Sequence, residues 1–316
     1  MERARMIWVL LILAVVIAIP LVLEAWRQVM DDAARESATG SFAELSQGVT
    51  HYEWHGPEDG PIIVCVHGLT APSFVWGGMT GALAASGYRV LTYDLYGRGY
   101  SERTTGLQDA DFFLQQLTDL LAHQGVKDDL TVVGYSMGGA ISACFAAQYP
   151  DRVRQMILLA PAGMGSVRTG LVRFIKNTPL AGDWLMLAIY PSMHRKGVRA
   201  ERNLPTSVPH ITALQEKELG FRGFTPAVLA SLRGILSRPL EAEHEAIAAR
   251  TIPVLAIWGQ QDAVIPASAR ETLAGWNSDA RQEVIAGAGH GLTYTHTDDI
   301  LRIMGGWMTA PKQSGD

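Results

Sequence analysis

The sequence predicts an α/β fold with a mostly parallel sheet that is covered by helices on both faces. Short runs rich in β-branched residues alternate with longer helical patterns, and most of these runs are continuously apolar, as in strands buried on both sides. At 316 residues the chain is long enough for one large domain. Its 48% apolar and 18% charged residues exclude disordered, coiled-coil and collagen-like chains.

The order of the elements follows from these runs. Strands are expected at 49–54, 61–68, 88–94, 130–136, 155–163, 251–259 and 281–287. Helices are expected near 75–86, 109–124, 137–149, 267–276 and 298–308. Residues 164–250 break the alternation, because they contain amphipathic helical pieces and no convincing strand. They are therefore expected to form a helical insertion.

The first 23 residues are expected to be a membrane anchor. Met6 to Leu23 is an 18-residue stretch without a charge, and a helix of that length spans about 27 Å, close to the ~30 Å hydrocarbon core of a bilayer. Arg3 and Arg5 precede it and acidic residues follow. The positive-inside rule then predicts a cytoplasmic N-terminus and a domain on the extracytoplasmic side, periplasmic in a bacterium.

Two alternatives remain for this segment. It could be a signal peptide whose cleavage releases a secreted protein, although Leu23 fits the small-residue cleavage rule poorly. It could also be a core or interfacial helix. Residues 24–41 are polar and rich in small residues, which is typical of a stalk between an anchor and a domain.

The strongest catalytic motif is Gly-Tyr-Ser-Met-Gly at 134–138, between an expected strand and an expected helix. In such an elbow the glycines allow strand and helix to approach closely, and Ser136 is held on a strained turn with its hydroxyl exposed. The N-terminus of the helix directs backbone N–H groups toward any oxyanion formed there. The alternative is a glycine-rich turn with a capping serine.

A serine nucleophile needs a base, and the base needs an orienting carboxylate. Asp262 follows the expected strand 251–259, and His290 follows the last expected strand. The order Ser136, Asp262, His290 is the one that this kind of elbow predicts. Taken singly, the aspartate could cap a turn and the histidine could be a surface residue.

From about Phe42 to Trp307 the chain resembles α/β-hydrolase-fold serine hydrolases, above all membrane-anchored monoacylglycerol lipases and carboxylesterases. The shared features are the anchor, the His-Gly-Leu loop at 67–69 and the elbow continued as Ser-Met-Gly-Gly. The resemblance implies a mostly parallel eight-stranded sheet, preceded by one transmembrane helix. It divides the chain into a core at 42–163 and 251–310 and a helical cap at 164–250.

The resemblance also implies roles for two loops. The backbone N–H groups of Leu69 and Met137 would form the oxyanion hole, with His67 packed beneath the loop. The loop Asp-Leu-Tyr-Gly-Arg-Gly-Tyr-Ser at 94–101 is similar to the family's D-x-x-G-x-G-x-S loop. Its Asp94 and Arg98 are expected to fix the loop, because Asp262 already fills the acid role.

Acyl chemistry is the expected activity, because Ser136 stands where dehalogenases and epoxide hydrolases of this fold carry an aspartate. The cap is rich in large apolar residues, which suits an acyl chain or only packs the cap: Phe174, Leu180, Trp184, Leu185, Met186, Phe221 and Phe224. We therefore expect a serine ester hydrolase acting on an apolar acyl ester or lipid. The alternatives are a carbon–carbon bond hydrolase of ring-cleavage products, a thioesterase, amidase or acyltransferase, and a non-catalytic binding protein.

Other ligands are not expected. The formal charge of −5 and the lack of a Lys/Arg-rich run argue against a nucleic-acid partner. Cys65 and Cys144 lie in apolar runs without metal-ligand spacing, and no histidine pair or glycine-rich phosphate loop is present, so neither a metal nor a cofactor is expected. Nothing in the sequence implies an obligate protein partner.

Overall fold

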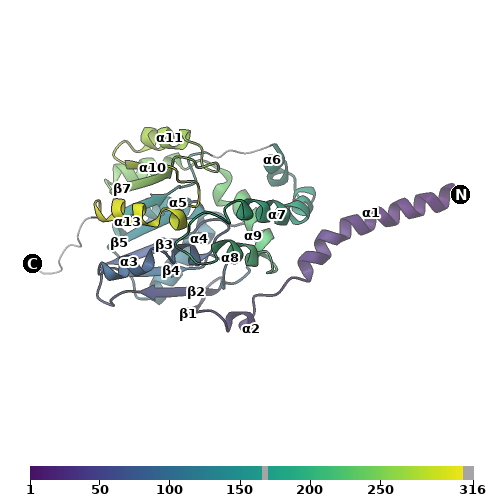
Figure 1. Cartoon of the computed structure of the whole chain (residues 1–316), viewed down its shortest axis with the longest axis horizontal. Coiled ribbons are helices and arrows are strands. Elements are labelled where there is room, and N and C mark those ends of the chain that lie inside the picture. Colours follow the sequence, from purple (N-terminus) through teal and green to yellow (C-terminus); the bar gives the residue numbers. More distant parts are fainter. Residues whose placement is uncertain (166–169, 309–316) are drawn as a thin grey trace, which may run out of the picture.

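The computed structural model describes residues 1–165 and 170–308, and its centre is one eight-stranded sheet (Figure 1). The strands are β1 (Ser41–Leu45), β2 (Gly48–His55), β3 (Ile62–Val66), β4 (Arg89–Tyr93), β5 (Leu130–Tyr135), β6 (Val153–Leu159), β7 (Val254–Gly259) and β8 (Arg281–Ile285). Their order in the sheet is β1-β2-β4-β3-β5-β6-β7-β8. β1 and β2 pair antiparallel, whereas β4 and all strands beyond it run parallel. The sheet is thus mostly parallel, as expected.

Helices cover both faces of this sheet, because parallel neighbours need crossover connections. One face carries α4 (Ala110–His123), α5 (Met137–Gln148), α10 (Glu241–Ala249) and α11 (Ser268–Trp276). The other carries η1 (Ser73–Trp76), α3 (Thr80–Ala85), α12 (Leu292–Thr295) and α13 (Thr297–Gly305). The short helix η2 (Pro150–Arg152) precedes β6.

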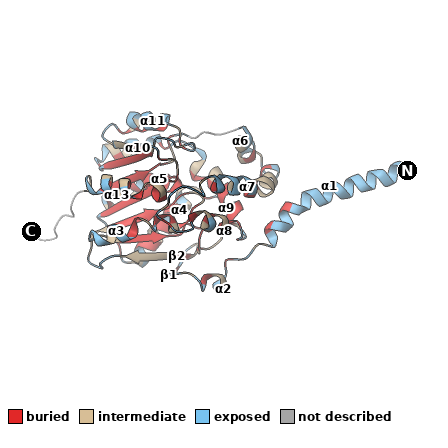
Figure 2. Cartoon of the chain, in the orientation of Figure 1, coloured by how far each residue is buried: buried red, intermediate tan, exposed pale blue. Residues whose placement is uncertain are grey.

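The central strands are continuously apolar because each contributes to two cores. In β3, Val64 and Val66 point into the core under α4 and α5, whereas Ile63 and Cys65 point into the core under α3 and α13. Figure 2 shows these strands as the most deeply buried part of the molecule. The edge strand β1 differs, since Ala43 is its one buried residue.

The insertion between β6 and β7 is helical in its described part. It contains α6 (Gly170–Asn177), α7 (Ala181–Ala200), α8 (Ile211–Glu218), α9 (Phe224–Arg233), η3 (Ile235–Ser237) and α10. The expected cap boundary at 250 is too late, because Leu240 and Ile247 at α10 pack into the core beneath α5. Residues 166–169 of the expected cap and 309–310 of the expected core lie outside the described residues.

The N-terminal helix α1 (Glu2–Ala25) projects from the domain and is almost wholly exposed (Figures 1 and 2). By length and composition it is able to cross a membrane. The expected stalk at 24–41 is not a free linker, however. It contains a short helix, α2 (Asp32–Arg35), and the side chains of Glu24, Met30 and Arg35 are buried against the domain. The polar, small residues of this segment indicate a linker, but its contacts with the domain hold it in place.

Candidate active site

Ser136 occupies the elbow between β5 and α5. Its φ of 52° lies in the left-handed region, so the residue is strained, as expected for such a turn. A Cβ at Gly138 would lie 1.9 Å from the carbonyl oxygen of Val66, which explains why the first turn of α5 requires glycine. The sequence thus forces α5 against the end of β3 and leaves the serine at the turn between them.

The structure brings Ser136, His290 and Asp262 together at the carboxyl ends of β5, β8 and β7. His290 Nε2 lies 3.0 Å from Ser136 Oγ, and His290 Nδ1 lies 2.8 Å from Asp262 Oδ2. Because a carboxylate only accepts hydrogen bonds, Nδ1–H donates to Asp262 and Nε2 is left to accept from the serine hydroxyl. This is the geometry that a serine nucleophile with its base and orienting acid requires.

The carboxylate of Asp262 is held in its ionised form. Burial alone would raise its pKa, but the hydrogen bond and charge of His290 and the backbone N–H groups of Ile265 and Val264 lower the pKa below its usual value. Those two N–H groups donate to Oδ1 over 2.9 and 2.7 Å. Oδ2 is therefore left to accept from the imidazole.

The loop after β3 places Leu69 beside the serine. A Cβ on Gly68 would lie 3.3 Å from Ser136 Cβ, and Leu69 and Ser136 line one cavity. Beneath the loop His67 is wholly buried and accepts the N–H of Leu95 at Nε2 over 2.8 Å. Burial lowers the pKa of His67 to about 4, so the ring is neutral and fixes the loop, as expected.

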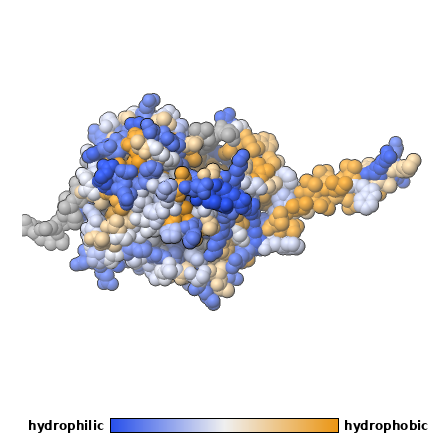
Figure 3. All heavy atoms as spheres, in the orientation of Figure 1, coloured by the Kyte–Doolittle hydropathy of each residue, from blue (hydrophilic) through white to orange (hydrophobic). Residues whose placement is uncertain are grey.

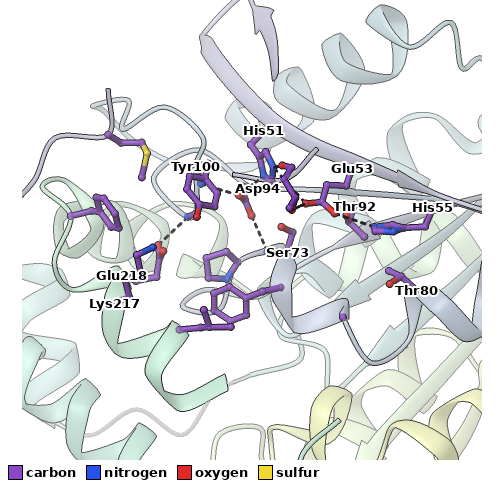
Figure 4. Close-up of a pocket in the computed structure, with 18 residues that line it drawn as sticks. His51, Glu53, His55, Ser73, Thr80, Thr92, Asp94, Tyr100, Lys217 and Glu218 are labelled. Carbon is purple, nitrogen blue, oxygen red and sulfur yellow. Dashed lines mark hydrogen bonds and ion pairs between the residues drawn. The ribbon is translucent and has the colours of Figure 1, made fainter. Parts of the chain in front are cut away.

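Asp94 has a separate set of partners. Oδ1 accepts the N–H of Ser73 over 2.8 Å, and Oδ2 accepts the N–H of Tyr100 over 2.9 Å and Nδ1–H of His51 over 2.8 Å. These groups line a second cavity of about 180 Å³, drawn in Figure 4. Burial would raise the pKa of Asp94, but His51 holds it well below its usual value. Asp94 thus stabilises its loop and does not contact His290.

Arg98 joins the loop that carries Leu69 to the cap. Its buried guanidinium donates to the carbonyl of Leu69 over 3.0 Å and, in α9, to the carbonyl of Ala227 over 3.2 Å and the hydroxyl of Ser231 over 2.8 Å. Sequence reasoning expected a loop-fixing role for Arg98. It gave no signal for the link to α9, because that contact spans more than 120 residues of chain.

A cavity of about 500 Å³ opens above Ser136. Its apolar lining comes from the cap and the core: Leu69, Met164, Val172, Leu232, Leu236, Val264, Ile265 and Trp276. The apolar cap residues expected to hold an acyl chain do not line it. Phe224 and Met186 pack inside the cap, whereas Phe174 and Leu180 are exposed. Helical spacing identified an apolar cap but not which of its faces meets the site.

The described residues contain no group of three or more His, Cys, Asp or Glu side chains arranged to hold a metal ion. Cys65 and Cys144 are free, buried thiols.

The chain is similar to several known hydrolases. It is 23% identical over 295 residues to monoacylglycerol lipase abhd6-B of Xenopus laevis, covering 88% of this chain and 83% of that protein. It is 25% identical to 2-hydroxy-6-oxo-6-phenylhexa-2,4-dienoate hydrolase of Comamonas testosteroni, covering 85% and 96%. The solved structure of a membrane phospholipase A, a bacterial virulence factor, matches with a TM-score of 0.69 at 21% identity and covers 97% of each chain. The model of the α/β-hydrolase fold matches residues 61–297, and the chain belongs to that family.

Proposed function

We propose that this protein is a serine ester hydrolase of the carboxylesterase or monoacylglycerol lipase type. The observation that carries the proposal is the hydrogen-bonded chain Ser136, His290 and Asp262 at an apolar cavity. Similarity to a monoacylglycerol lipase supports an ester as the bond that is cleaved. An apolar cavity of this size suits the acyl part of the substrate.

The proposed mechanism uses an acyl-enzyme. Ser136 Oγ attacks the ester carbonyl while His290 Nε2 takes its proton, and the N–H groups of Leu69 and Met137 stabilise the oxyanion. His290 returns the proton to the alcohol as the ester bond breaks. Water, deprotonated by the same imidazole, then releases the acid and restores the serine. Asp262 stabilises the imidazolium in both halves.

We also propose that α1 anchors the enzyme in a membrane. The basic residues Arg3 and Arg5 lie at the N-terminal end of α1, and the domain lies at its C-terminal end. The positive-inside rule then gives a single-pass protein with a cytoplasmic N-terminus and an extracytoplasmic catalytic domain. Cleavage of α1 as a signal peptide is the alternative, and the mass of the mature protein distinguishes the two.

The deciding experiment measures hydrolysis of glycerol and p-nitrophenyl esters with acyl chains from acetyl to palmitoyl. The native enzyme and the Ser136→Ala variant are compared, with Ser142→Ala as the matched control. Ser142 lies in α5, and its buried hydroxyl has no hydrogen-bond partner among the described residues. We expect turnover by the native and Ser142→Ala proteins and none by Ser136→Ala.

Two outcomes would contradict the proposal. Ester hydrolysis retained by Ser136→Ala would place the nucleophile elsewhere. No hydrolysis of any ester, with Ser136 still labelled by a phosphonate, would keep the nucleophile but favour carbon–carbon bond, thioester or amide chemistry. The similarity to a carbon–carbon bond hydrolase makes its ring-cleavage substrate the next to be tested.

A further inference from the structure

The contact between α1 and α7 fixes how deep the cap sits relative to the apolar span. Trp184 Nε1 in α7 donates to the backbone carbonyl of Ile17 in α1 over 2.9 Å. Ile17 lies inside the uncharged stretch that ends at Leu23. At 1.5 Å per residue, the six residues between these two positions correspond to about 9 Å along the helix. The start of α7 therefore lies about 9 Å nearer the middle of the span than Leu23, at the domain end of the span.

The domain is held in this position by contacts on the outer side of the span. Glu24 Oε1 accepts the N–H of Gly223 over 2.7 Å, and Arg27 Nη1 donates to Thr225 Oγ1 over 3.0 Å. Glu24 and Arg27 also form an ion pair. Since α1 and the cap are joined at two levels, the cap keeps a fixed orientation relative to the span.

Apolar side chains are exposed at the same end of the cap. Leu180 at the start of α7 is 85% exposed, and Phe174 and Leu171 in α6 are 48% and 43% exposed. Figure 3 shows apolar surface over this part of the cap, next to the base of α1. Together with Trp184, these three residues define the apolar corner of the cap.

We propose that the apolar corner is inserted into the surface of the lipid bilayer that α1 crosses. The proposal rests on the membrane anchoring proposed above. An apolar span of about 27 Å has no length to spare in a core of ~30 Å, so Ile17, and with it Trp184, must lie within the hydrocarbon. The resulting depth of about 9 Å for Trp184 falls within the 5–10 Å at which interfacial helices bury their apolar faces.

The placement identifies the source of the substrate. Val172 and Arg173 of α6 line the cavity above Ser136, whereas Leu171 and Phe174 of the same helix are exposed at the apolar corner. The helix α6 therefore separates the catalytic cavity from the lipid. We infer that the substrate is an ester lipid resident in the adjacent leaflet, which enters past α6 without crossing water.

The depth of the corner is measured on the full chain in vesicles of phosphatidylcholine and phosphatidylglycerol. An environment-sensitive fluorophore is attached at Leu180→Cys, and at Leu204→Cys as the control. Leu204 is also exposed but follows the opposite end of α7, and Cys65 and Cys144 are buried. We expect lipids that carry a quencher in the acyl chain to quench the label at 180 and not the label at 204. Equal quenching, or none, at both positions would overturn the proposal.

The functional test compares vesicle-embedded and water-soluble esters. Replacing both Phe174 and Leu180 by aspartate should slow hydrolysis of the vesicle-embedded ester on the order of tenfold or more, because a charged side chain opposes insertion of the corner into the acyl layer. Hydrolysis of the soluble ester, and both rates in Leu204→Asp, should stay unchanged. If the native protein and the double variant hydrolyse the vesicle-embedded ester at equal rates, the proposed insertion of the apolar corner is refuted. A native enzyme inactive on both esters would instead refute the proposed function, while the quenching experiment still decides the docking.

Discussion

Replacing Gly138 by alanine tests whether close packing of α5 against β3 sets the oxyanion hole. The added Cβ would lie 1.9 Å from the carbonyl oxygen of Val66 and 2.6 Å from that of His67. Favourable contacts lie at about 3.5 Å, so the helix and the strand end must separate by more than about 1 Å. Both obstructing atoms belong to the backbone, which leaves no flexible side chain to move aside.

This separation acts directly on the two proposed oxyanion donors. Met137 precedes Gly138 at the start of α5, and Leu69 follows two residues after His67. Moving the helix away from the strand therefore widens the gap between the N–H groups of Met137 and Leu69. Loss of one such donor lowers kcat by about 10²–10³, and the strain should lower the free energy of unfolding by about 1–3 kcal/mol.

The assay measures kcat and KM on a soluble ester together with thermal unfolding. Gly81→Ala is the matched control, because Gly81 lies in α3 and a Cβ there meets no heavy atom within 4 Å. That variant should keep its kcat and gain roughly 0.5–1 kcal/mol, since alanine favours a helix over glycine. A Gly138→Ala protein with native kcat and native melting temperature would refute the reasoning.

Three further predictions concern the groups around the site. Asp262→Asn should lower kcat on the order of 10⁴-fold by removing the orientation of the imidazole, and near-native turnover would show that the acid is misassigned. Arg98→Lys should lower kcat more than it raises KM, because lysine does not supply the several fixed donors that Arg98 directs to Leu69 and its other partners. A loss of ligand affinity as large as the loss of kcat would contradict a positioning role for Arg98. Burial raises the pKa of Glu218 to about 7 against the opposing charge of Arg103, so the folded chain binds that proton more tightly than the unfolded chain. The native protein should therefore lose about 3 kcal/mol of unfolding free energy between pH about 4.5 and about 7, and chemical denaturation of Glu218→Gln should show no such slope.

The main architecture could be predicted because the central strands carry a strong local signal. Continuous apolar runs and the alternation with helices identified β2 to β8 and the helical insertion. The strand β1 was missed because an exposed edge strand with one buried residue, Ala43, has almost no apolar pattern. The cap boundary was placed too late for a similar reason. The helical pattern of α10 does not reveal that Leu240 and Ile247 face the core sheet.

The candidate site was predictable where it depends on the ends of strands. A glycine-framed serine and polar residues after β7 and β8 could be read from the chain, and the structure brings Ser136, Asp262 and His290 together. The residues that line the cavity could not be predicted from the sequence, because they depend on which face each cap helix turns toward the site. The same holds for the docking of residues 24–41, whose polar composition gives no sign of tertiary contacts.

The helix α9 connects α1 to the loop that carries Leu69 and so limits how the cap can move. At its start, Glu24 binds the N–H of Gly223 and Arg27 binds Thr225. One turn later, Arg98 binds the carbonyl of Ala227 and also the carbonyl of Leu69. A swing of α9 would break buried and part-buried hydrogen bonds to charged groups, each worth about 1.5–3 kcal/mol. Opening of the site is therefore expected at α6, which carries the exposed Phe174, and a membrane that takes up this helix as proposed would then control access to the serine.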